Sequence, residues 1–353
     1  MESLLVRAAD PGPDSGAGSL MNMSLLLLTV SGMVLIVLAA DYFTNGVEWL
    51  GYHLHLEEGA VGSLLAALGT ALPETLVPVM AIIFGQGHSE NAIGLGAILG
   101  APFMLATIGF SVIGVGLWAS RRKIRTLNVP TAGPMTDDLG FFLWAFAVVV
   151  LASFLPRIIH PIVALGLLAL YGRHAWKLVE GHNTSEQRNV APSQPLRLSS
   201  RPRPPLVLVI VQVVLALIGL ILGAHFFVTA LDGITKIVTI SPFLLSVIVT
   251  PVATELPEVL NSVIWIRRGK DTLAVGNVTG AMAFQSSIVP ALGIAFTPWQ
   301  LTPLEIATAV LAWLAALWIW LKSRSHSLRV IELLTAGLFY LAYIGLVLAL
   351  ITR

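Results

Sequence analysis

The sequence predicts an all-α membrane protein with about ten transmembrane helices, arranged as two inverted five-helix repeats. Of its 353 residues, 56% are hydrophobic and only 11% are charged, whereas a soluble domain carries about 25% charged residues. Apolar stretches of about 18 residues or more, each long enough to cross a bilayer as a helix, recur along the chain. Residues 41–74 also align without a gap with residues 225–258, which indicates an internal duplication.

Hydropathy and helix-breaking residues divide the chain into ten spans. Those of the first half are predicted at 23–50, 60–84, 91–118, 139–155 and 157–179, and those of the second at 205–235, 243–266, 272–296, 303–321 and 330–351. Residues 1–22 are expected to be a short disordered tail and not a signal peptide. Residues 181–205, rich in Pro, Ser and Arg, are expected to be a flexible cytoplasmic linker. The repeats then occupy 23–180 and 206–353.

Basic residues give the orientation in the membrane. They cluster after the third, seventh and ninth spans and in the linker, at 121–125, 267–270, 322–329 and 188–203. A ten-span arrangement places all four clusters on one side, and the positive-inside rule makes that side cytoplasmic. We therefore expect a multi-pass protein of the cell membrane with both termini outside. Because each half has five spans, the second half enters the membrane from the opposite side to the first.

Each half places Leu-Pro-Glu within an apolar span, as GTALPE (69–74) and ATELPE (253–258). Proline removes a backbone donor and leaves helical carbonyls without partners, and a glutamate in the membrane is costly unless it is paired or hydrated. Thr70 and Thr254 lie one turn before the glutamates and offer hydroxyl oxygens. Hard oxygen donors suit Ca²⁺ or Na⁺, and the absence of cysteine excludes thiolate sites. One copy could be a kinked helix with a protonated glutamate, but two related copies favour a shared ion site.

These segments resemble the α-repeats of the cation/Ca²⁺ exchanger superfamily, in particular the membrane domain of prokaryotic sodium/calcium exchangers. The family pattern runs from an AD…G helix through G-T-S-L-P-E to G-N-x-x-G-S-N-x-F-[N/D]. The first copy has ADYFTNG (40–46), GTALPE and GAILGAPFML (96–105), and the second has ATELPE and GNVTGAMAFQ (276–285). The resemblance covers nearly the whole chain apart from the tail and the linker.

The resemblance implies a set of ion ligands at the motif positions. These are the carboxylates of Glu74 and Glu258, the hydroxyls of Thr70 and Thr254, and the backbone carbonyls of Ala67 and Pro251. The chain departs from the family where serine follows the threonine, with Ala71 in one copy and Glu255 in the other, and at the closing Asn/Asp, with Leu105 and Gln285. Glu255 could add a carboxylate ligand or could face an aqueous vestibule. Gln285 can still offer a neutral carbonyl oxygen.

The function implied is an antiporter, not an enzyme, that exchanges Ca²⁺ for Na⁺ by alternating access. Its ions would be transported substrates, with no cofactor and no nucleic-acid partner, and a monomer in the lipid bilayer would be the functional unit. The missing flanking ligands leave open a Ca²⁺/H⁺ or other cation/H⁺ exchanger with altered stoichiometry. A carboxylate-lined channel and an intramembrane protease are further alternatives, although the sequence has no selectivity-filter segment and no HExxH or GxSxG motif.

Other polar and small residues allow two interpretations each. Asp41 and His225 occupy equivalent positions in the first helices of the two halves, where they could steer cations, carry protons or pack helices. Asn277 is expected to pack helices or cap a backbone group. Glycines predicted to allow close helix approach are Gly94, Gly96, Gly100, Gly276 and Gly280. Side chains predicted to anchor the membrane interface are His160, His174 and the tryptophans near 299–320.

Overall fold

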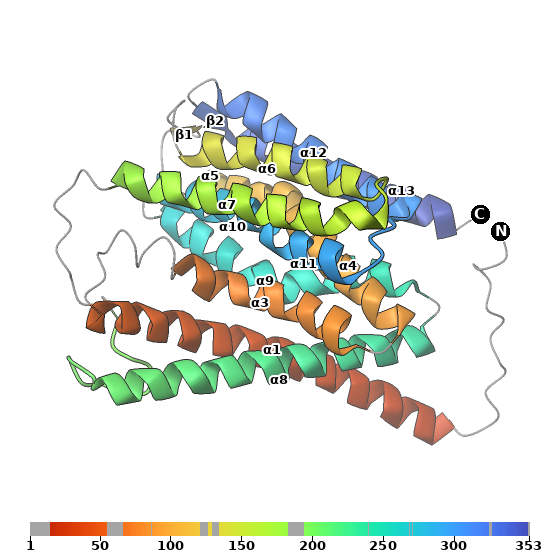
Figure 1. The fold of residues 1–353 in the computed structure, drawn as a ribbon, viewed down its shortest axis with the longest axis horizontal. Helices are drawn as coiled ribbons and strands as arrows, with labels where there is room; N and C mark the ends of the chain where they lie inside the picture. The colour runs from red at the N-terminus through yellow and green to blue at the C-terminus, as the bar shows by residue number, and fades with distance from the viewer. Residues whose placement is uncertain are drawn as a thin grey trace.

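A computed structural model describes residues 15–54, 66–85, 87–120, 126–128, 134–182, 194–238, 240–267, 269, 271–324 and 327–351. In these residues, the chain is a bundle of helices with one two-stranded sheet (Figure 1). The first half contains α1 (Ser15–His53), α3 (Ala66–Val79), the π-helix η2 (Met80–Phe84), α4 (His88–Met104), the π-helix η3 (Leu105–Gly109), α5 (Phe110–Ala119), β1 (Thr126–Asn128), α6 (Pro134–Ala152), the 3₁₀-helix η4 (Arg157–Ile159) and α7 (His160–His182).

The second half repeats this order of helices. It contains α8 (Leu206–Ile237), α9 (Pro242–Arg267), α10 (Asp271–Gln285), α11 (Ile288–Phe296), α12 (Pro303–Ser323), β2 (Ser327–Arg329) and α13 (Val330–Ile351). All ten predicted spans correspond to helices, and the third and eighth are each interrupted near their middle, by η3 and by the break at Ser286–Ser287. Two starts differ from the prediction: α1 begins within the predicted tail, and α6 begins at Pro134, five residues before 139.

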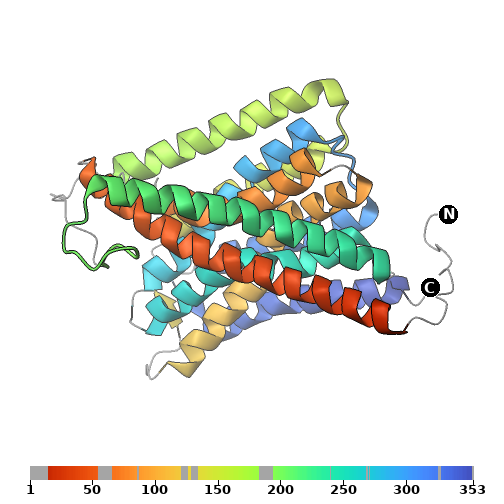
Figure 2. The same ribbon diagram turned by 90° about the horizontal axis from the view of Figure 1, so that it is seen from below.

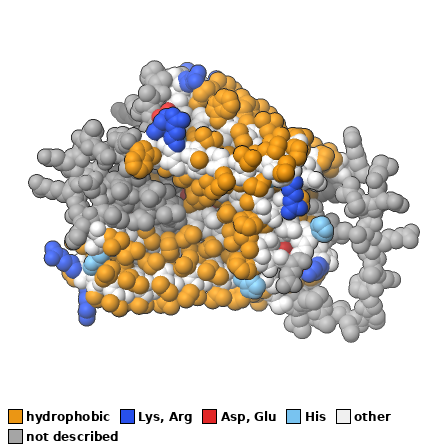
Figure 3. Space-filling view, in the orientation of Figure 1, with side chains coloured by type: hydrophobic (Ala, Val, Ile, Leu, Met, Phe, Trp, Pro, Cys, Tyr) orange, Lys and Arg blue, Asp and Glu red, His pale blue; other side chains and the backbone are white. Residues whose placement is uncertain are grey.

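Eight helices among the described residues are long and apolar enough to cross a membrane, and the bent α9 makes a ninth. The remaining predicted span is a shorter apolar segment, Ala71–Phe84. Large hydrophobic side chains are exposed on the outside of the bundle, as at Trp144, Ile162 and Val207. In Figure 3, hydrophobic side chains cover the middle of the visible face, and Lys and Arg lie towards its ends. An apolar band of this kind is the surface that a lipid environment requires, so the chain is a multi-pass membrane protein.

The ends of the bundle agree with the predicted connectivity. Strand β1 pairs antiparallel with β2, with Leu127 opposite Leu328, and so joins the loops that follow the third and ninth spans. The start of α1 and the end of α13 lie at the other end of the bundle (Figure 1). An even number of crossings between the two termini explains this arrangement.

Helices α1 and α8 form an antiparallel pair along one face of the bundle (Figures 1 and 2). Their backbones meet at Gly32 and Gly223: a Cβ built on Gly32 would lie 2.9 Å from the backbone nitrogen of Phe227, and one on Gly223 would lie 3.0 Å from Ile36 Cγ1. Such close approach is what small residues allow between membrane helices. The pair packs against α3 and α9, and α8 also contacts α4. The two broken spans are the most buried of the membrane-length helices, with 78% of the most apolar window of His88–Ala119 and 72% of that of Asp271–Phe296 buried.

The last part of the linker is ordered, contrary to the prediction. Helix α7 continues to His182, residues 183–193 lie outside the described part of the chain, and residues 194–205 form a strap across the ends of α1 and α8. Asn45 and Trp49 donate hydrogen bonds to the carbonyls of Pro195 and Gln194, at 3.2 and 3.1 Å. The prediction failed because side chains far away in the sequence, and not the composition of the linker, supply the partners of this backbone.

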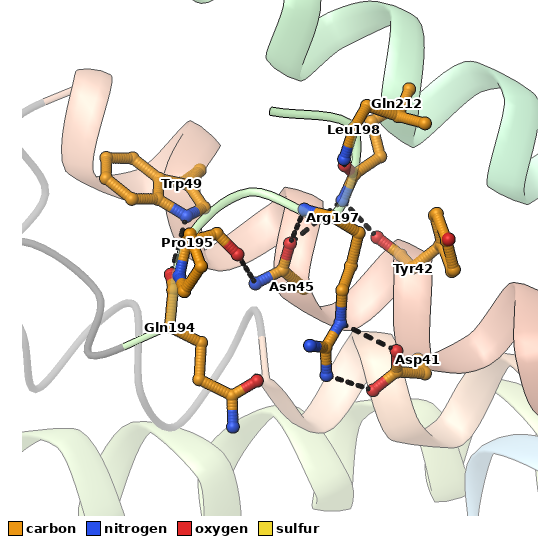
Figure 4. A network of polar contacts seen from close by, with 9 residues as sticks. All are labelled: Asp41, Tyr42, Asn45, Trp49, Gln194, Pro195, Arg197, Leu198 and Gln212. Atoms are coloured by element: carbon orange, nitrogen blue, oxygen red, sulfur yellow. Dashed lines mark hydrogen bonds and ion pairs between the residues drawn. The ribbon is translucent and has the colours of Figure 1, made fainter. Parts of the chain in front are cut away.

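A buried glutamine and an ion pair complete the strap (Figure 4). Gln212 of α8 accepts a hydrogen bond from the backbone nitrogen of Leu198 and donates to the Tyr42 carbonyl and to Asn45 Oδ1, at 2.9, 2.8 and 3.0 Å. Arg197 donates two hydrogen bonds of 2.9 Å to the carboxylate of Asp41. The strap therefore ties the last turns of α1 to the first turns of α8.

Candidate cation-binding site

The first Leu-Pro-Glu segment lies within an uninterrupted part of α3, whereas the second lies at a bend of α9. Helix α3 contains Pro73 and Pro78 and continues directly into the π-helix η2. Helix α9 bends by 49° between its parts Pro242–Leu256 and Glu258–Arg267, with Pro257 at the bend. Proline explains this bend because it cannot donate the helical hydrogen bond and crowds the preceding turn. Glu74 and Glu258 lie immediately after these prolines.

The third and eighth spans, which are both interrupted, pack against the helices that carry the two glutamates. In the first half, the interruption begins at Leu105, where α4 passes into η3. In the second half it follows Gln285, the last residue of α10. These two residues are the ones that the motif alignment pairs, so the structure places the breaks at equivalent positions of the repeats. Gln285 is 1% exposed, and its side chain lies among those of α9.

Three carboxyl groups from the two halves meet in the interior. Glu74, Glu255 and Glu258 are exposed by 4%, 0% and 3%. Glu74 lies within electrostatic range of both other carboxylates and within hydrogen-bonding range of Gln285. The burial of Glu255 rules out a vestibule-facing side chain in this structure. Buried carboxylates repel one another and lose their hydration, so the cluster needs compensating positive charge.

The hydrogen bonds in the cluster are asymmetric. Glu255 accepts from Thr254 Oγ1 at its Oε1 atom and from Gln285 Nε2 at its Oε2 atom, both at 2.9 Å. By contrast, one oxygen on each of three other side chains is buried without a hydrogen-bond partner: Glu74 Oε2, Glu258 Oε2 and Gln285 Oε1. Each of these atoms is an acceptor. Buried acceptors without donors are costly, and a cation is one partner that can satisfy oxygens of this kind.

The remaining predicted ligands are placed only in part. Thr70 and Ala67 lie at the start of α3 (Ala66–Val79), but their side chains are outside the described part of the chain. Thr254 and Pro251 lie on α9, and both are buried. Within the described residues, no three acidic or histidine side chains are close enough together to hold a metal ion by themselves. A bound ion would therefore also need hydroxyl, amide or carbonyl oxygens.

Asn277 braces α10 against α9 beside the cluster. Its Nδ2 donates to the backbone carbonyl of Glu258 at 3.0 Å and to Ser262 Oγ at 3.3 Å. Ser262 Oγ donates to the same carbonyl at 2.8 Å. This bears out the expectation that Asn277 caps a backbone group. The amide thus holds the half of α9 that follows the bend.

The two halves pack differently beside the site. Gly96 and Gly100 let α9 lie against α4: a Cβ on Gly100 would come within 2.9 Å of the Val247 carbonyl oxygen. At the equivalent Gly276, no described atom lies within 4 Å of such a Cβ, and at Gly280 the nearest is Asp138 Oδ2 at 4.0 Å. The prediction of close packing is therefore confirmed for α4 and wrong for α10 in this conformation. The bundle is closed beside the cluster toward the start of α4 and more loosely packed toward the start of α10.

Two candidates fall outside the cluster. Asp41 is paired with Arg197, a partner that the sequence did not indicate because the two are far apart in the chain. His225 is exposed on α8. Neither hydrogen-bonds to any of the three buried glutamates in the described structure.

Three predicted interface anchors make hydrogen bonds within the bundle. His160 is buried and donates from Nε2 toward the Ala152 and Leu155 carbonyls, at 3.1 and 3.2 Å. Trp299 is buried and donates to the Val149 carbonyl at 3.0 Å. His174 donates to Asp138, a carboxylate that the sequence analysis passed over. Only a tertiary partner distinguishes these residues from surface anchors.

Comparison with known proteins follows the same division into halves. The family model described as sodium/calcium exchanger protein matches residues 24–176 and 208–352. The uncharacterized membrane protein MJ0091 of Methanocaldococcus jannaschii is 24% identical over 250 residues, which are 71% of this chain and 74% of that protein.

Two solved structures share the fold. The H⁺/Ca²⁺ exchanger CAX is 17% identical and superposes with a TM-score of 0.69, covering 94% of this chain and 85% of that one. The sodium-calcium exchanger NCX_Mj, soaked with Na⁺ and Sr²⁺, is 20% identical with a TM-score of 0.56 and coverage of 92% and 99%. Both similarities concern the fold, which is the two-repeat arrangement predicted from the sequence.

Proposed function

Because the chain belongs to the sodium/calcium exchanger protein family, we propose that it is an antiporter that exports Ca²⁺ in exchange for Na⁺ by alternating access. One observation carries the proposal: the buried, partnerless oxygens of Glu74, Glu258 and Gln285 lie in one cluster built from both halves. Hard oxygens of this kind are the ligands that Ca²⁺ and Na⁺ prefer. An ion would neutralise charge that the membrane interior otherwise penalises.

The proposed ligands come from both repeats. Glu74 and Glu258 supply the charge, and the hydroxyls of Thr70 and Thr254 and the carbonyls of Ala67 and Pro251 supply neutral oxygens. A single carboxylate pair can be shared by one Ca²⁺ or by Na⁺ ions in turn, which is what exchange requires. Binding between the two halves also lets a relative movement of the halves expose the ion to either side.

Helix packing suggests how access alternates. Close contact of α4 with α9 closes one route to the cluster, and looser packing around Gly276 and Gly280 leaves the other route less obstructed. In the opposite state, we expect α3 to approach the glycines of α10 while α9 leaves those of α4. The α1–α8 pair, tied by the strap, would slide across the site as one unit.

A proton-coupled exchanger is the second candidate. Leu105 stands where its repeat partner Gln285 offers an oxygen, so the first half lacks one polar ligand. Fewer ligands leave fewer places for Na⁺, and carboxylates can carry protons in its stead. The fold similarity to an H⁺/Ca²⁺ exchanger is compatible with this alternative.

Ion flux in vesicles tests both candidates. Purified protein is reconstituted into liposomes, and ⁴⁵Ca²⁺ movement is driven by an imposed Na⁺ gradient or, separately, by a pH gradient. We expect Na⁺-driven flux that Glu258→Gln abolishes and that Glu90→Gln, outside the cluster, leaves intact. Flux driven only by the pH gradient would select the second candidate. Flux that ignores both gradients, or survives in Glu258→Gln, would refute the proposal.

A further inference from the structure

Glu255 has no counterpart in the first repeat, where Ala71 occupies its position, although it is fully buried and belongs to the carboxylate cluster. Its two oxygens have different surroundings from those of Glu74 and Glu258. Both are already occupied, one by the Thr254 hydroxyl and one by the Gln285 amide. An ion ligand should instead present a free oxygen, as Glu74 and Glu258 do.

Glu255 accepts its hydrogen bonds from Thr254 and Gln285, the two neutral polar side chains that the second repeat can offer to an ion. A glutamine amide has a donor end and an acceptor end, and a carboxylate can accept only from the donor end. Binding of Gln285 Nε2 to Glu255 therefore leaves Gln285 Oε1 as the free end, and this atom is buried without a partner. In the same way, Glu255 is the nearer of two acceptors of the Thr254 hydroxyl, at 2.9 Å against 3.4 Å for the Thr250 carbonyl, and a hydroxyl that gives its single hydrogen to Glu255 keeps its lone pairs available.

We propose that Glu255 is a positioning residue that takes the donor hydrogens of Thr254 and Gln285 and so turns both acceptor oxygens toward the transported cation. This inference rests on the proposed ion site and assigns Glu255 a role beside it, not among its ligands. A role outside the ligand set agrees with the finding that, among the described residues, no three carboxylates lie close enough together to share one ion. A carboxylate behind neutral ligands also makes them more basic, as partners of metal ligands commonly do.

The asymmetry of the repeats follows from this arrangement. In the first repeat, Ala71 offers no carboxylate and Leu105 offers no amide, so the orienting group and its ligand are absent together. In the second repeat, both are present and hydrogen-bonded to each other. Among the described residues, the neutral side-chain oxygens that a carboxylate orients thus come from α9 and α10.

Titration of Ca²⁺ into the purified full-length protein tests the proposal through a double-mutant cycle of Glu255→Gln and Gln285→Leu. Thr254 and Gln285 donate to different oxygens of Glu255, and an amide at 255 replaces one of these oxygens by a donor group. The neighbour that faces this donor must turn its own oxygen toward residue 255 and away from the cation. We expect Glu255→Gln to weaken Ca²⁺ binding by about 10- to 100-fold, the usual effect of losing a partner of a metal ligand. In the Gln285→Leu background, the same change should cost much less. If the two losses multiply instead, Glu255 acts independently of Gln285 and the proposal is wrong.

Thermal unfolding without Ca²⁺ separates positioning from a general structural role. Glu255→Gln removes one of three mutually repelling buried carboxylates, so the ion-free protein should be as stable as the unmodified protein or more so. The rise in Tm on adding Ca²⁺ should shrink in step with the affinity. A marked loss of ion-free stability would overturn the proposal.

Failure of the exchanger proposal is recognised separately. In that case the unmodified chain would not bind Ca²⁺, or Glu258→Gln would bind it normally. Normal binding by the unmodified chain, loss in Glu258→Gln and multiplying losses in the cycle would reject the role of Glu255 alone.

Discussion

His174 Nε2 lies 2.9 Å from Asp138 Oδ1, and this pair joins three helices in the interior of the membrane domain. Asp138 belongs to α6 and His174 to α7, while Thr279 of α10 donates to the other carboxylate oxygen at 2.9 Å. The ring of Phe141 stacks on the imidazole, with centroids 4.4 Å apart. The carboxylate thus anchors α10, the helix that carries Gln285 and Asn277 to the candidate site.

Removal of this carboxylate should destabilise the protein. Asp138→Ala removes the carboxylate acceptor of His174 and leaves Thr279 only its longer contact of 3.5 Å to the Gly276 carbonyl. A buried donor without an acceptor costs about 1–3 kcal/mol. We therefore expect a clear fall in Tm of the detergent-purified protein. The adjacent Asp137 is exposed on the same helix turn, so Asp137→Ala is the matched control and should change little. Equal effects of the two substitutions would show that the three-helix junction does not contribute to stability.

The strap offers a comparison between a buried amide and an exposed ion pair. Gln212 is 1% exposed and makes three hydrogen bonds, so Gln212→Leu strands several buried groups and should cost about 2 kcal/mol or more. The side chains of Arg197 and Asp41 are 35% and 51% exposed, and a surface pair of this kind contributes about 0.2–1 kcal/mol. Arg197→Ala should therefore lower Tm by much less than Gln212→Leu. The reverse order would mean that the ion pair, and not the buried amide, holds the strap.

The helices and the central glutamates could be predicted from sequence because their signals are local or repeated. Apolar runs identify spans, and the repeated Leu-Pro-Glu segments mark the two glutamates wherever the helices end up in space. The family pattern paired Leu105 with Gln285 as its closing position, but it gave no sign that the central spans are interrupted at these two residues. Burial of Glu74 beside Glu258 followed from the inverted repeat.

Tertiary partners account for what the sequence missed. Nothing near Asp41 in the chain indicates Arg197, and nothing near His174 indicates Asp138, because a hydrogen bond between distant segments has no sequence period. The direction in which Glu255 points was left open for the same reason. The sequence does not show which face of α9 is turned toward the interior, and neighbouring residues of a helix point in different directions. A sequence repeat also cannot indicate which of two alternating conformations is adopted. It predicts equal packing of the glycines of α4 and those of α10, and the structure shows unequal packing.

Calcium should stabilise the protein through the partnerless oxygens of the cluster. A ligand at 100 times its Kd adds about 2.7 kcal/mol to the stability of the state that binds it. Scanning fluorimetry of the chelator-treated protein should therefore show a rise in Tm on addition of Ca²⁺. Mg²⁺ holds its water tightly and needs near-octahedral geometry, so it should have a weaker effect at the same concentration. Glu74→Gln should remove the Ca²⁺-dependent rise, and an undiminished rise would place the ion elsewhere.

Equivalent glycines of the two repeats should respond oppositely to the same substitution. An added methyl group at Gly100 would meet the Val247 carbonyl oxygen at 2.9 Å and Pro251 Cγ at 3.0 Å, whereas at Gly280 its nearest described neighbour is 4.0 Å away. Gly100→Ala should therefore push α9 from α4 and disfavour the conformation seen here, while Gly280→Ala should fit it. Single introduced cysteines can measure this change, because the chain has no cysteine of its own. Placed near the start of α4 and of α10, they report access to membrane-impermeant thiol reagents on each side.

We expect Gly100→Ala to increase labelling near α4 and to decrease it near α10. Gly280→Ala should leave both unchanged or favour the present pattern. Identical labelling in the two variants would mean that the glycine contacts do not control which side of the site is open.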